Sequence, residues 1–386
     1  MRRLTRPSPT LFLCLFVSQA AMLVLSPVLP DVAHDLGVST ATAGQLRSLS
    51  GLTGGATAVL LALAPRRPGL RDLLGAGAAL VAAGSALSAA APSFFVLAAA
   101  QGVAGIGIGL LVAVGIAAAG EWPAAEQRPG VLAWAIAGMP AAWIAGMPIV
   151  GAVAHVSWRA AWLVPTLVAL VAAGVVRRRP ADRASSRARG RLGAWRDPAV
   201  ARFAAGELLA NAAWASVLTY AGALLLETYG LSPAVVALGL GAMAAAMVPG
   251  TFLARRHASG AGHGLLAALT TLQAGAVVVL GAVRPAAALT LGVLALMAFV
   301  NGWRSMVASA VGMDAAPQDR VAVMSMRAAA NQFGYLLGAA AGGLALALGG
   351  FTGLGLALGG LFAASVLVHI PALLPSGPPV TAEGAA

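Results

Sequence analysis

Four polar residues stand out in the sequence because each lies inside a long apolar run. Glu207 and Asn211 are four residues apart, so they share one face if the run is a helix. Asn301 and Arg304 lie close together in a later run. An ionisable group inside a membrane is costly and is by default a functional candidate. Because a guanidinium holds a neighbouring carboxylate in its charged form, Glu207 could load and release a proton as Arg304 approached and withdrew.

A second candidate pair for proton coupling lies near the ends of the first two apolar runs. Asp31 follows the first run and Arg47 lies inside the second, so the two could pair near one face of the membrane. The plainer interpretation is that Asp31 and Asp35 are exposed cap or loop charges. Glu207 could likewise be an interfacial residue, and Arg304 a structural arginine with its stem in apolar surroundings.

Other polar side chains in the apolar runs are candidates for contacts with a bound small molecule: Ser18, Gln19, Gln101, Asn211 and Asn301. His155 and His369 lie near the ends of their runs and are interpreted as interfacial. The sequence contains no His-Glu-x-x-His, no cysteine pair and no Gly-x-Ser-x-Gly. We therefore expect no enzyme activity, no catalytic residue, no metal and no cofactor.

The composition indicates that the lipid bilayer is the solvent for most of the chain. Of the 386 residues, 60% are hydrophobic and only 9% are charged, against about 25% charged in soluble domains. The formal net charge is +12, and all 24 basic residues are arginines. Because most of these arginines lie in short segments between apolar runs, we exclude nucleic acid as a partner and expect lipid instead.

Twelve apolar runs are long enough to cross a membrane as helices, which takes roughly 20 residues each. They cover residues 10–30, 41–64, 72–91, 93–119, 130–154, 159–176, 203–226, 233–254, 263–282, 286–311, 321–346 and 351–371. With the N-terminus inside, 20 of the 24 arginines fall on the inner side, and such an excess fixes the orientation. We predict an all-α, multi-pass protein of the cytoplasmic (inner) membrane with both termini in the cytoplasm.

The two halves of the chain resemble each other at a nearly constant offset. LGVS at 36–39 recurs as YGLS at 229–232, and QRPGVLA at 127–133 as DRVAVMS at 319–325. We predict an N-terminal six-helix bundle over 1–176 and a C-terminal six-helix bundle over 203–372. A basic cytoplasmic linker over 177–202 joins them, and a cytoplasmic tail over 373–386 follows.

Small residues form stripes at helical spacing in the fifth and eleventh runs. The stripe in the fifth run consists of Gly138, Ala142 and Gly146, and the offset carries the last two onto Gly334 and Gly338. Such stripes let two helix backbones approach closely in lipid. We expect the fifth-run stripe to pack against a helix of the other half and to act in gating. Ordinary packing in a glycine-rich membrane protein is the alternative.

The segment GMPIVGAVAHVSWRAAW at 146–162 resembles the fifth-helix signature of the major facilitator superfamily, in its proton-driven antiporter branches. The matching residues are Gly146, Pro148, Gly151, Trp158, Arg159 and Trp162. The segments at 26–46 and 101–109 are similar to the first-helix end and the fourth helix of the same families. The resemblance covers nearly the whole chain and favours bacterial twelve-helix exporters of the arabinose-efflux and drug-efflux type. It implies two six-helix bundles around a central cavity, alternating access and proton antiport.

The loop after the second run departs from the pattern of that family. LALAPRRPGLR at 61–71 keeps the basic and glycine positions of the family loop, which are Arg66, Arg67, Gly69 and Arg71. Pro65 replaces the acid that usually latches the cytoplasmic gate in the family. Ala98 stands where the fourth helix of the family carries an arginine, so proton coupling through that arginine is excluded.

These features favour a secondary transporter that exports a small organic molecule, such as a drug, sugar or metabolite, in exchange for protons. An uptake symporter or facilitator on the same fold is the first alternative, and a non-transporting membrane sensor or partner subunit is the second. The resemblance implies that helices one, four, seven and ten line the cavity, which places Glu207 and Arg304 there. A weakly charged cavity suits a neutral or lipophilic compound better than a polyanion. We expect a monomer whose partners are the substrate, protons and the lipid bilayer.

Overall fold

The computed structural model describes residues 7–64, 68–180, 197–257, 262–315 and 320–370. Within these ranges the secondary structure is helical, without strands. Ten helical segments there are long and apolar enough to cross a membrane. One of them, Met326–His369, contains two spans because non-helical backbone at Gly349 and Gly350 divides it, and the 24-residue helix α3 adds another. The described residues therefore contain the twelve expected spans, which confirms the all-α membrane fold.

The N-terminal half is built from six spans, three of which are interrupted. They consist of α1 (Pro7–Leu23) with α2 (Leu25–Asp35), α3 (Thr40–Leu63), α4 (Leu70–Ala89), α5 (Phe94–Glu121), α6 (Arg128–Ala141) with η2 (Ala142–Gly146) and α7 (Met147–Ala154), and α8 (Trp158–Ala161) with α9 (Leu163–Arg177), while the short turn η1 (Ala125–Gln127) precedes α6. Helix α1 ends at Leu23 because Pro27, four residues later, has no N–H to donate to the Leu23 carbonyl. Pro148 has the same relation to Ile144, inside the π-helical turn η2.

The C-terminal half contains the other six spans. They consist of α10 (Pro198–Tyr229), α11 (Pro233–His257), α12 (His263–Ala282), α13 (Ala287–Ala315) and the two spans of α14 (Arg320–His369). The chain turns at Gly350, whose φ of 58° is a conformation that residues with a side chain rarely adopt. Gly230, with φ of 62°, ends α10 in the same left-handed conformation.

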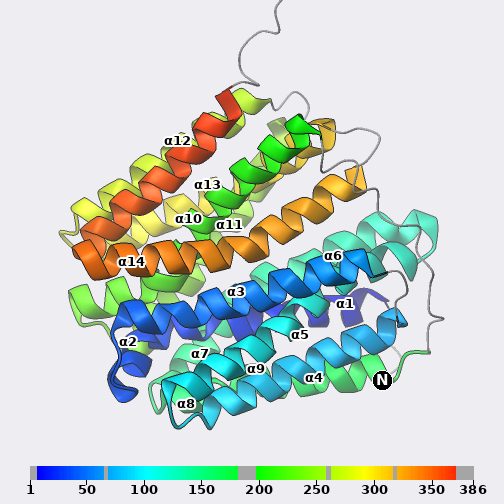
Figure 1. The fold of residues 1–386 in the computed structure, drawn as a ribbon, viewed down its shortest axis with the longest axis horizontal. Coiled ribbons are helices and arrows are strands. Elements are labelled where there is room, and N and C mark those ends of the chain that lie inside the picture. Colours follow the sequence, from blue (N-terminus) through cyan, green and yellow to red (C-terminus); the bar gives the residue numbers. More distant parts are fainter. Residues whose placement is uncertain (1–6, 65–67, 181–196, 258–261, 316–319, 371–386) are drawn as a thin grey trace, which may run out of the picture.

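All spans run between two ends of the molecule, which we name by their connections. The turn end carries the short connections after α2, α7, α10 and the first span of α14, and the linker end carries the start of α1, the end of α9 and the end of α14. Figure 1 shows the two halves lying closest at the left, which is the turn end, and diverging toward the right. In that view α14 and α3 separate progressively toward the linker end.

Glycine stripes hold each half together by close backbone contact. A Cβ at Gly138 would overlap the backbone carbonyl of Phe12 in α1, and one at Gly338 would overlap that of Ala212 in α10. Gly334 also faces α10, at Asn211. The fifth span thus packs on the first, and the eleventh on the seventh, as the repeat requires.

The expectation that the fifth-span stripe crosses to the other half is therefore wrong. Gly138 faces α1, and a Cβ at Gly146 would approach Leu23 of α1 at 3.1 Å, so both contacts stay within the N-terminal half. Gly151, one turn further, does cross, because a Cβ there would overlap Ala237 of α11. The register places the stripe toward the first span, whereas another face of the same segment packs against α11, where Ile144, Met147 and Pro148 lie near Gly241.

Contacts between the halves concentrate toward the turn end. A Cβ at Gly222 of α10 would overlap the carbonyl oxygen of Ser26 in α2, and one at Gly44 of α3 would overlap the ring of Tyr220. The Thr40 hydroxyl donates to the Glu227 carboxylate at 2.6 Å. The first and seventh spans, and the second and eleventh, therefore meet on this side of the molecule.

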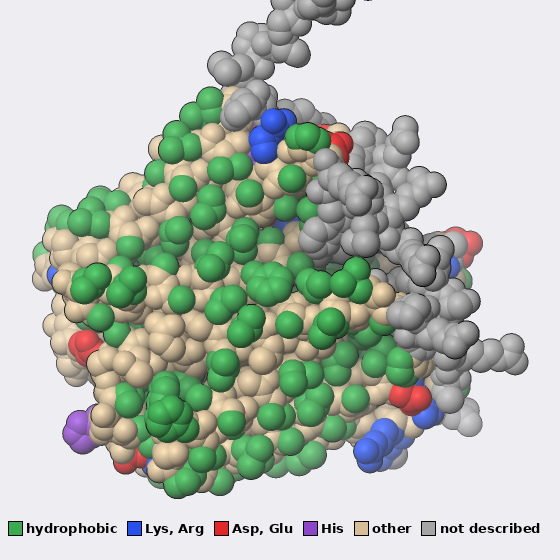
Figure 2. Space-filling view, viewed as in Figure 1, with side chains coloured by type: hydrophobic (Ala, Val, Ile, Leu, Met, Phe, Trp, Pro, Cys, Tyr) green, Lys and Arg blue, Asp and Glu red, His purple; other side chains and the backbone are tan. Residues whose placement is uncertain are grey.

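The surface in Figure 2 matches a protein surrounded by lipid. Hydrophobic side chains cover the middle of this face, and coloured charged side chains lie mostly toward its right and left ends. Large apolar side chains are strongly exposed on spans of both halves, including Phe95 at 83% and Leu348 at 81%. In water such a surface would aggregate, whereas in a bilayer it needs no cover.

Several sequence predictions fall at the linker end. Arg66, Arg67, residues 181–196 of the linker and the tail at 373–386 lie outside the described residues. Gly69 is buried and precedes α4, and Arg71 donates to the carbonyl oxygen of Arg179 at 3.1 Å, which ties α4 to the end of α9. The domain boundaries at 176 and 203 stay a prediction.

Replacing Gly338 with Leu should destabilise the fold, whereas Gly275→Leu should not. The new side chain at 338 would force α10 and α14 apart, and overpacking of this kind costs about 1–3 kcal/mol. A Cβ at Gly275 in α12 meets no heavy atom within 4 Å outside its own helix. Thermal unfolding of both purified variants in one detergent measures the difference, and equal midpoints would contradict the close contact between α10 and α14.

Candidate functional site

A buried carboxylate held by two arginines forms the main charged cluster of the C-terminal half. Glu207 of α10 is fully buried. Its Oε1 accepts a hydrogen bond from Arg304 Nη2 of α13 at 2.5 Å. Its Oε2 accepts one from Arg327 Nε of α14 at 2.8 Å. Both carboxylate oxygens are therefore engaged by charged donors from two different helices, and charge-assisted bonds of this kind are the strong ones.

Hydroxyl groups hold the two arginines in place. Arg304 Nε donates to the Thr270 hydroxyl of α12 at 3.1 Å. Arg327 Nη2 donates to the Ser305 hydroxyl at 2.8 Å, and its Nη1 to the Ser309 hydroxyl at 3.0 Å, both on α13. These bonds link α10, α12, α13 and α14 around one carboxylate, so a displacement of any of these helices is felt at Glu207.

The charges of the cluster do not balance. Two guanidiniums surround one carboxylate, so the three side chains together carry one excess positive charge. Arg304 is buried, whereas 21% of the Arg327 side chain is exposed. Arg327 is thus the member of the cluster that reaches solvent-accessible space, and the arrangement stabilises an ionised Glu207 as long as both arginines stay.

His369 lies beside this cluster at the end of α14. Its imidazole is 3% exposed, and its Nε2 has no hydrogen-bond partner. A Cβ at Gly206 would overlap that nitrogen, so glycine is what lets the ring approach the backbone next to Glu207. His263 at the start of α12 follows, with ring centroids 5.9 Å apart. His369 is the last residue of α14 and is buried against α10, and its interpretation as an interfacial residue stays a prediction.

The structure brings together the pair that the sequence predicted and adds a residue that the sequence analysis missed. Glu207 and Arg304 contact each other directly. The sequence analysis counts Arg327 only among the arginines of the inner side, at the start of the run 321–346, whereas the structure places it in α14 with its side chain bonded to Glu207. There was a reason to look for a second partner of Glu207. A buried carboxylate has two oxygens, and one arginine that bonds it through a single nitrogen leaves the other oxygen unpaired.

The predicted amide residues of the C-terminal half surround the cluster. Asn211 Nδ2 donates to the backbone carbonyl of Glu207 at 2.8 Å, and its Oδ1 accepts from Asn331 at 3.3 Å. Asn331 is exposed, so this pair lies at the edge of accessible space. Asn301 is buried and accepts from Gln273 of α12 at 3.4 Å. Its partner thus lies inside its own half.

The predicted polar residues of the N-terminal half are all buried and bonded within that half. Gln19 accepts from the Trp143 indole at 3.1 Å, which joins the first span to η2. Gln101 donates to the Ser88 hydroxyl of α4 at 2.9 Å. Ser18 donates to the backbone carbonyl of Leu15 at 2.7 Å.

The suggested pair of Asp31 and Arg47 does not form. Asp31 is exposed, Arg47 is 2% exposed, and the ion pairs among the described residues include neither. Asp35 instead forms an ion pair at the turn end, with Arg159, and it also accepts a hydrogen bond from the Trp158 indole at 3.1 Å. The Trp-Arg element of the fifth-helix signature thus fastens α8 to the end of α2.

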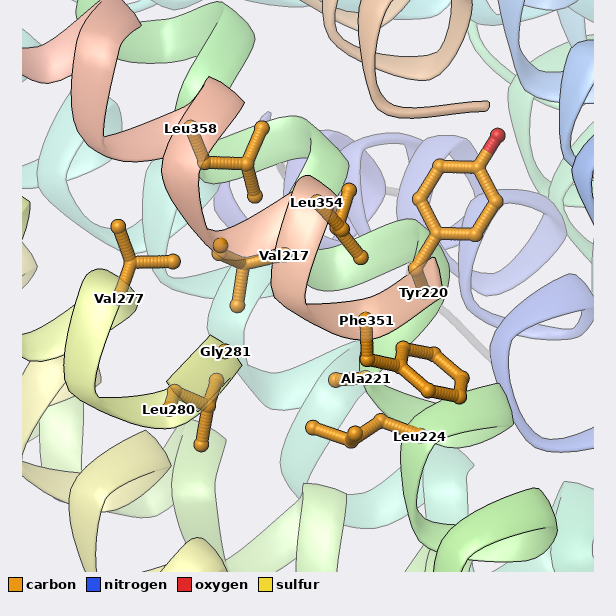
Figure 3. Close-up of a pocket in the computed structure, with 11 residues that line it drawn as sticks. Val217, Tyr220, Ala221, Leu224, Val277, Leu280, Gly281, Phe351, Leu354 and Leu358 are labelled. Atoms are coloured by element: carbon orange, nitrogen blue, oxygen red, sulfur yellow. The ribbon is translucent and has the colours of Figure 1, made fainter. Parts of the chain in front are cut away.

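A separate pocket in the C-terminal half is almost wholly apolar. Figure 3 shows it between α10, α12 and the second span of α14, with the Tyr220 hydroxyl pointing away from the other labelled side chains. Its lining consists of Val217, Tyr220, Ala221, Leu224, Val277, Leu280, Gly281, Phe351, Leu354, Gly355 and Leu358. Without polar groups to orient a ligand, it is a packing gap. In the described part of the chain, no cluster of three His, Cys, Asp or Glu residues could hold a metal ion.

Comparison with known proteins agrees with this architecture. A family model described as the Major Facilitator Superfamily matches residues 11–320. A chloramphenicol resistance protein of Streptomyces lividans is 33% identical over 374 residues, which cover 91% of this chain and 90% of that protein.

Solved structures share the fold at low sequence identity. A bacterial homologue of the human lysosomal transporter Spinster, in its inward-facing and occupied conformation, has a TM-score of 0.73 and 14% identity over 94% of each chain. A D-xylose–proton symporter has a TM-score of 0.74 and 14% identity, covering 93% of this chain and 95% of the symporter. With the helical spans, the internal repeat and the family match over most of its length, the chain belongs to the Major Facilitator Superfamily of membrane transporters.

Proposed function

We propose that this protein is a proton-coupled exporter of a small organic molecule and that Glu207 is the proton carrier. The observation that carries the proposal is the burial of Glu207 between arginines of two helices. An ionisable cluster inside a membrane-spanning bundle is rarely retained for stability, because replacing it with apolar residues is often neutral or stabilising.

The cluster binds a proton when one of its arginines withdraws. With both guanidiniums in place, the carboxylate is stabilised in its charged form. If Arg327 moves away, only Arg304 remains to offset the cost of a charge in the low-dielectric bundle. Protonation then removes the negative charge, and the return of Arg327 expels the proton. One carboxylate thus loads and releases one proton per cycle.

Helix α14 connects this cluster to the contact between the halves. Arg327 lies near its start, while Gln332, Tyr335 and Gly343 further along face α3 of the N-terminal half. A Cβ at Gly343 would overlap the Gln45 side chain, and Gln45 donates to the carbonyl oxygen of Ala339 at 3.0 Å. When α3 and α14 part, α14 shifts against α13, and the bonds of Arg327 to Ser305 and Ser309 change with it.

The halves exchange access between the two ends of the molecule. In this structure they are in close contact toward the turn end, and in the proposed cycle the substrate therefore enters from the linker end. Arginines concentrate at the linker end, which supports a cytoplasmic location for that end and for both chain termini in the cytoplasmic (inner) membrane. The captured state is then the one that receives substrate from the cytoplasm.

The chloramphenicol resistance protein gives the first compound to test. Its identity of 33% over most of both chains supports export rather than uptake, and chloramphenicol is therefore the first labelled substrate for this protein. Counterflow of label in proteoliposomes separates a transporter from a non-transporting sensor or partner subunit. Accumulation against a gradient that depends on an imposed pH difference separates proton antiport from facilitation.

Glu207→Gln should abolish proton-driven accumulation and keep exchange of substrate down its own gradient. Glutamine preserves the shape of the side chain but cannot release a proton, so coupling is lost while alternating access persists. Accumulation of labelled chloramphenicol in proteoliposomes with an imposed pH gradient, compared with counterflow without one, measures the two properties separately.

Glu126→Gln is the matched control, since Glu126 is an exposed acid at the linker end. It should leave both properties unchanged. If Glu207→Gln still accumulates substrate while Asp31→Asn does not, the carrier is the acid of the first span and the assignment of Glu207 falls.

Gly222→Leu should reduce transport to background in a protein that still inserts and folds. The new side chain would hold α10 away from Ser26 of α2, so the halves could not close at the turn end. Gly292→Leu in α13 is the control, because a Cβ there meets no heavy atom within 4 Å outside its own helix. Normal counterflow by Gly222→Leu would show that closure at this contact is dispensable.

A further inference from the structure

Arg47 is buried at the interface between the halves without a counter-charge. It lies on α3, and its side chain is directed toward the C-terminal half, with the guanidinium carbon 5.7 Å from the centre of the Tyr335 ring on α14. The ion pairs among the described residues do not include it. A contact with an aromatic face recovers only part of the cost of burying a cation.

The two nitrogen atoms that lack partners are informative. Arg47 Nε and Nη2 are both buried and donate to no hydrogen-bond partner among the described residues, although each carries at least one proton to donate. These two atoms form one edge of the planar guanidinium. Two parallel N–H groups on one edge match the two oxygens of a carboxylate, which is how arginine binds carboxylates in bidentate fashion.

A second unpaired donor lies on the same interface. Gln332 of α14 is 3% exposed, and its Nε2 is buried without a partner. That nitrogen faces α3 at Gly54, where a Cβ would approach it at 2.9 Å. Gln332 and Tyr335 are one helical turn apart on α14, so the unpaired amide and the aromatic ring beside Arg47 belong to one strip of that helix.

Glycine and tyrosine residues lie near Arg47 along this interface. Gly44 and Gly51 flank Arg47 by one turn on either side along α3, facing Tyr220 and Tyr335 respectively. Tyr220 already donates its hydroxyl to the carbonyl oxygen of Ala339 at 2.9 Å. A ligand bound here would therefore contact the Arg47 guanidinium with its charged group and the tyrosine rings with the rest of its body.

We propose that the Nε–Nη2 edge of Arg47 binds the carboxylate of a transported monocarboxylate with an apolar body. The inference rests on the proposed transport function and names its substrate class. In this structure α14 covers the edge. A substrate that has entered from the linker end pairs with it as α3 and α14 part, in the passage to the state that opens toward the turn end. Binding replaces an unpaired buried charge with a bidentate pair, and thereby favours the state in which the halves have separated at Arg47.

Binding of sodium benzoate to the purified full-length protein in detergent tests the proposal. Thermal shift and titration calorimetry at constant ionic strength report it without a pH gradient. We expect benzoate to raise the unfolding midpoint, acetate to bind more weakly because it has no apolar body, and benzyl alcohol and chloride to give no shift. An equal shift with chloride would assign a monatomic-anion site, and an equal shift with benzyl alcohol an apolar site; either result overturns the proposal.

Three variants locate the binding. Arg47→Lys keeps the charge but not the fork and should weaken benzoate binding by about tenfold or more. Arg47→Met should abolish the benzoate shift and raise the midpoint without ligand, because it removes an unpaired buried charge. Arg128→Gln, at an exposed arginine, should behave as wild type. Unchanged benzoate affinity in Arg47→Lys, or a lowered midpoint in Arg47→Met, contradicts the proposal.

These measurements are independent of proton coupling. If Glu207→Gln turned out to be fully coupled, the benzoate results would still decide the role of Arg47. Conversely, a protein that exports chloramphenicol with a pH gradient but does not bind benzoate through Arg47 would keep the proposed function and lose only this substrate class.

Discussion

Close backbone approach between helices is the constraint on which the rest of this structure depends. In lipid, apolar side chains gain little by leaving the solvent, so helices associate through packing and hydrogen bonds instead. Glycine supplies the approach in both halves, where a Cβ at Gly138 would strike the Phe12 carbonyl and one at Gly338 the Ala212 carbonyl. Because the fifth span packs on the first as the eleventh packs on the seventh, the repeat in the sequence becomes two halves built in the same way.

Close packing within the C-terminal half allows a charge cluster to be buried there. Glu207 can lie away from water only because α13 and α14 present Arg304 and Arg327 at fixed positions, with Thr270, Ser305 and other hydroxyls holding the guanidiniums. In a loosely packed bundle the same carboxylate would be an uncompensated charge. The glycine contact of α14 with α10 therefore sets the distance across which Arg327 reaches Glu207, and packing and electrostatics in this half are parts of one arrangement.

Hydropathy, together with the depth of polar residues in each apolar run, was enough to predict the spans and one ion pair. The direction in which side chains point could not be predicted in the same way. The twelve spans follow from runs of apolar residues, and Glu207 and Arg304 could be paired because their depths in two runs agree. Helical periodicity identified the stripe of Gly138 and Gly146, but it did not name the helix that the stripe meets, because no single-span pattern encodes the rotation of one span relative to another. For the same reason the sequence analysis paired Arg47 with Asp31, whereas the rotation of α3 directs the Arg47 side chain toward Tyr335.

The two arginine sites differ in a way that suits coupled transport. In the C-terminal half the arginines are satisfied by Glu207, and in the interface Arg47 is left with an open edge. Helix α14 contributes to both, through Arg327 at one site and Tyr335 at the other. In the proposed scheme, a substrate carboxylate at the open edge favours the parting of α3 from α14, and the shift of α14 loosens Arg327 from Glu207. When the substrate has left, a proton binds Glu207 in place of the withdrawn arginine, so substrate and proton are carried in exchange. One helix thus links substrate binding at Arg47 to the charge of Glu207 on α10.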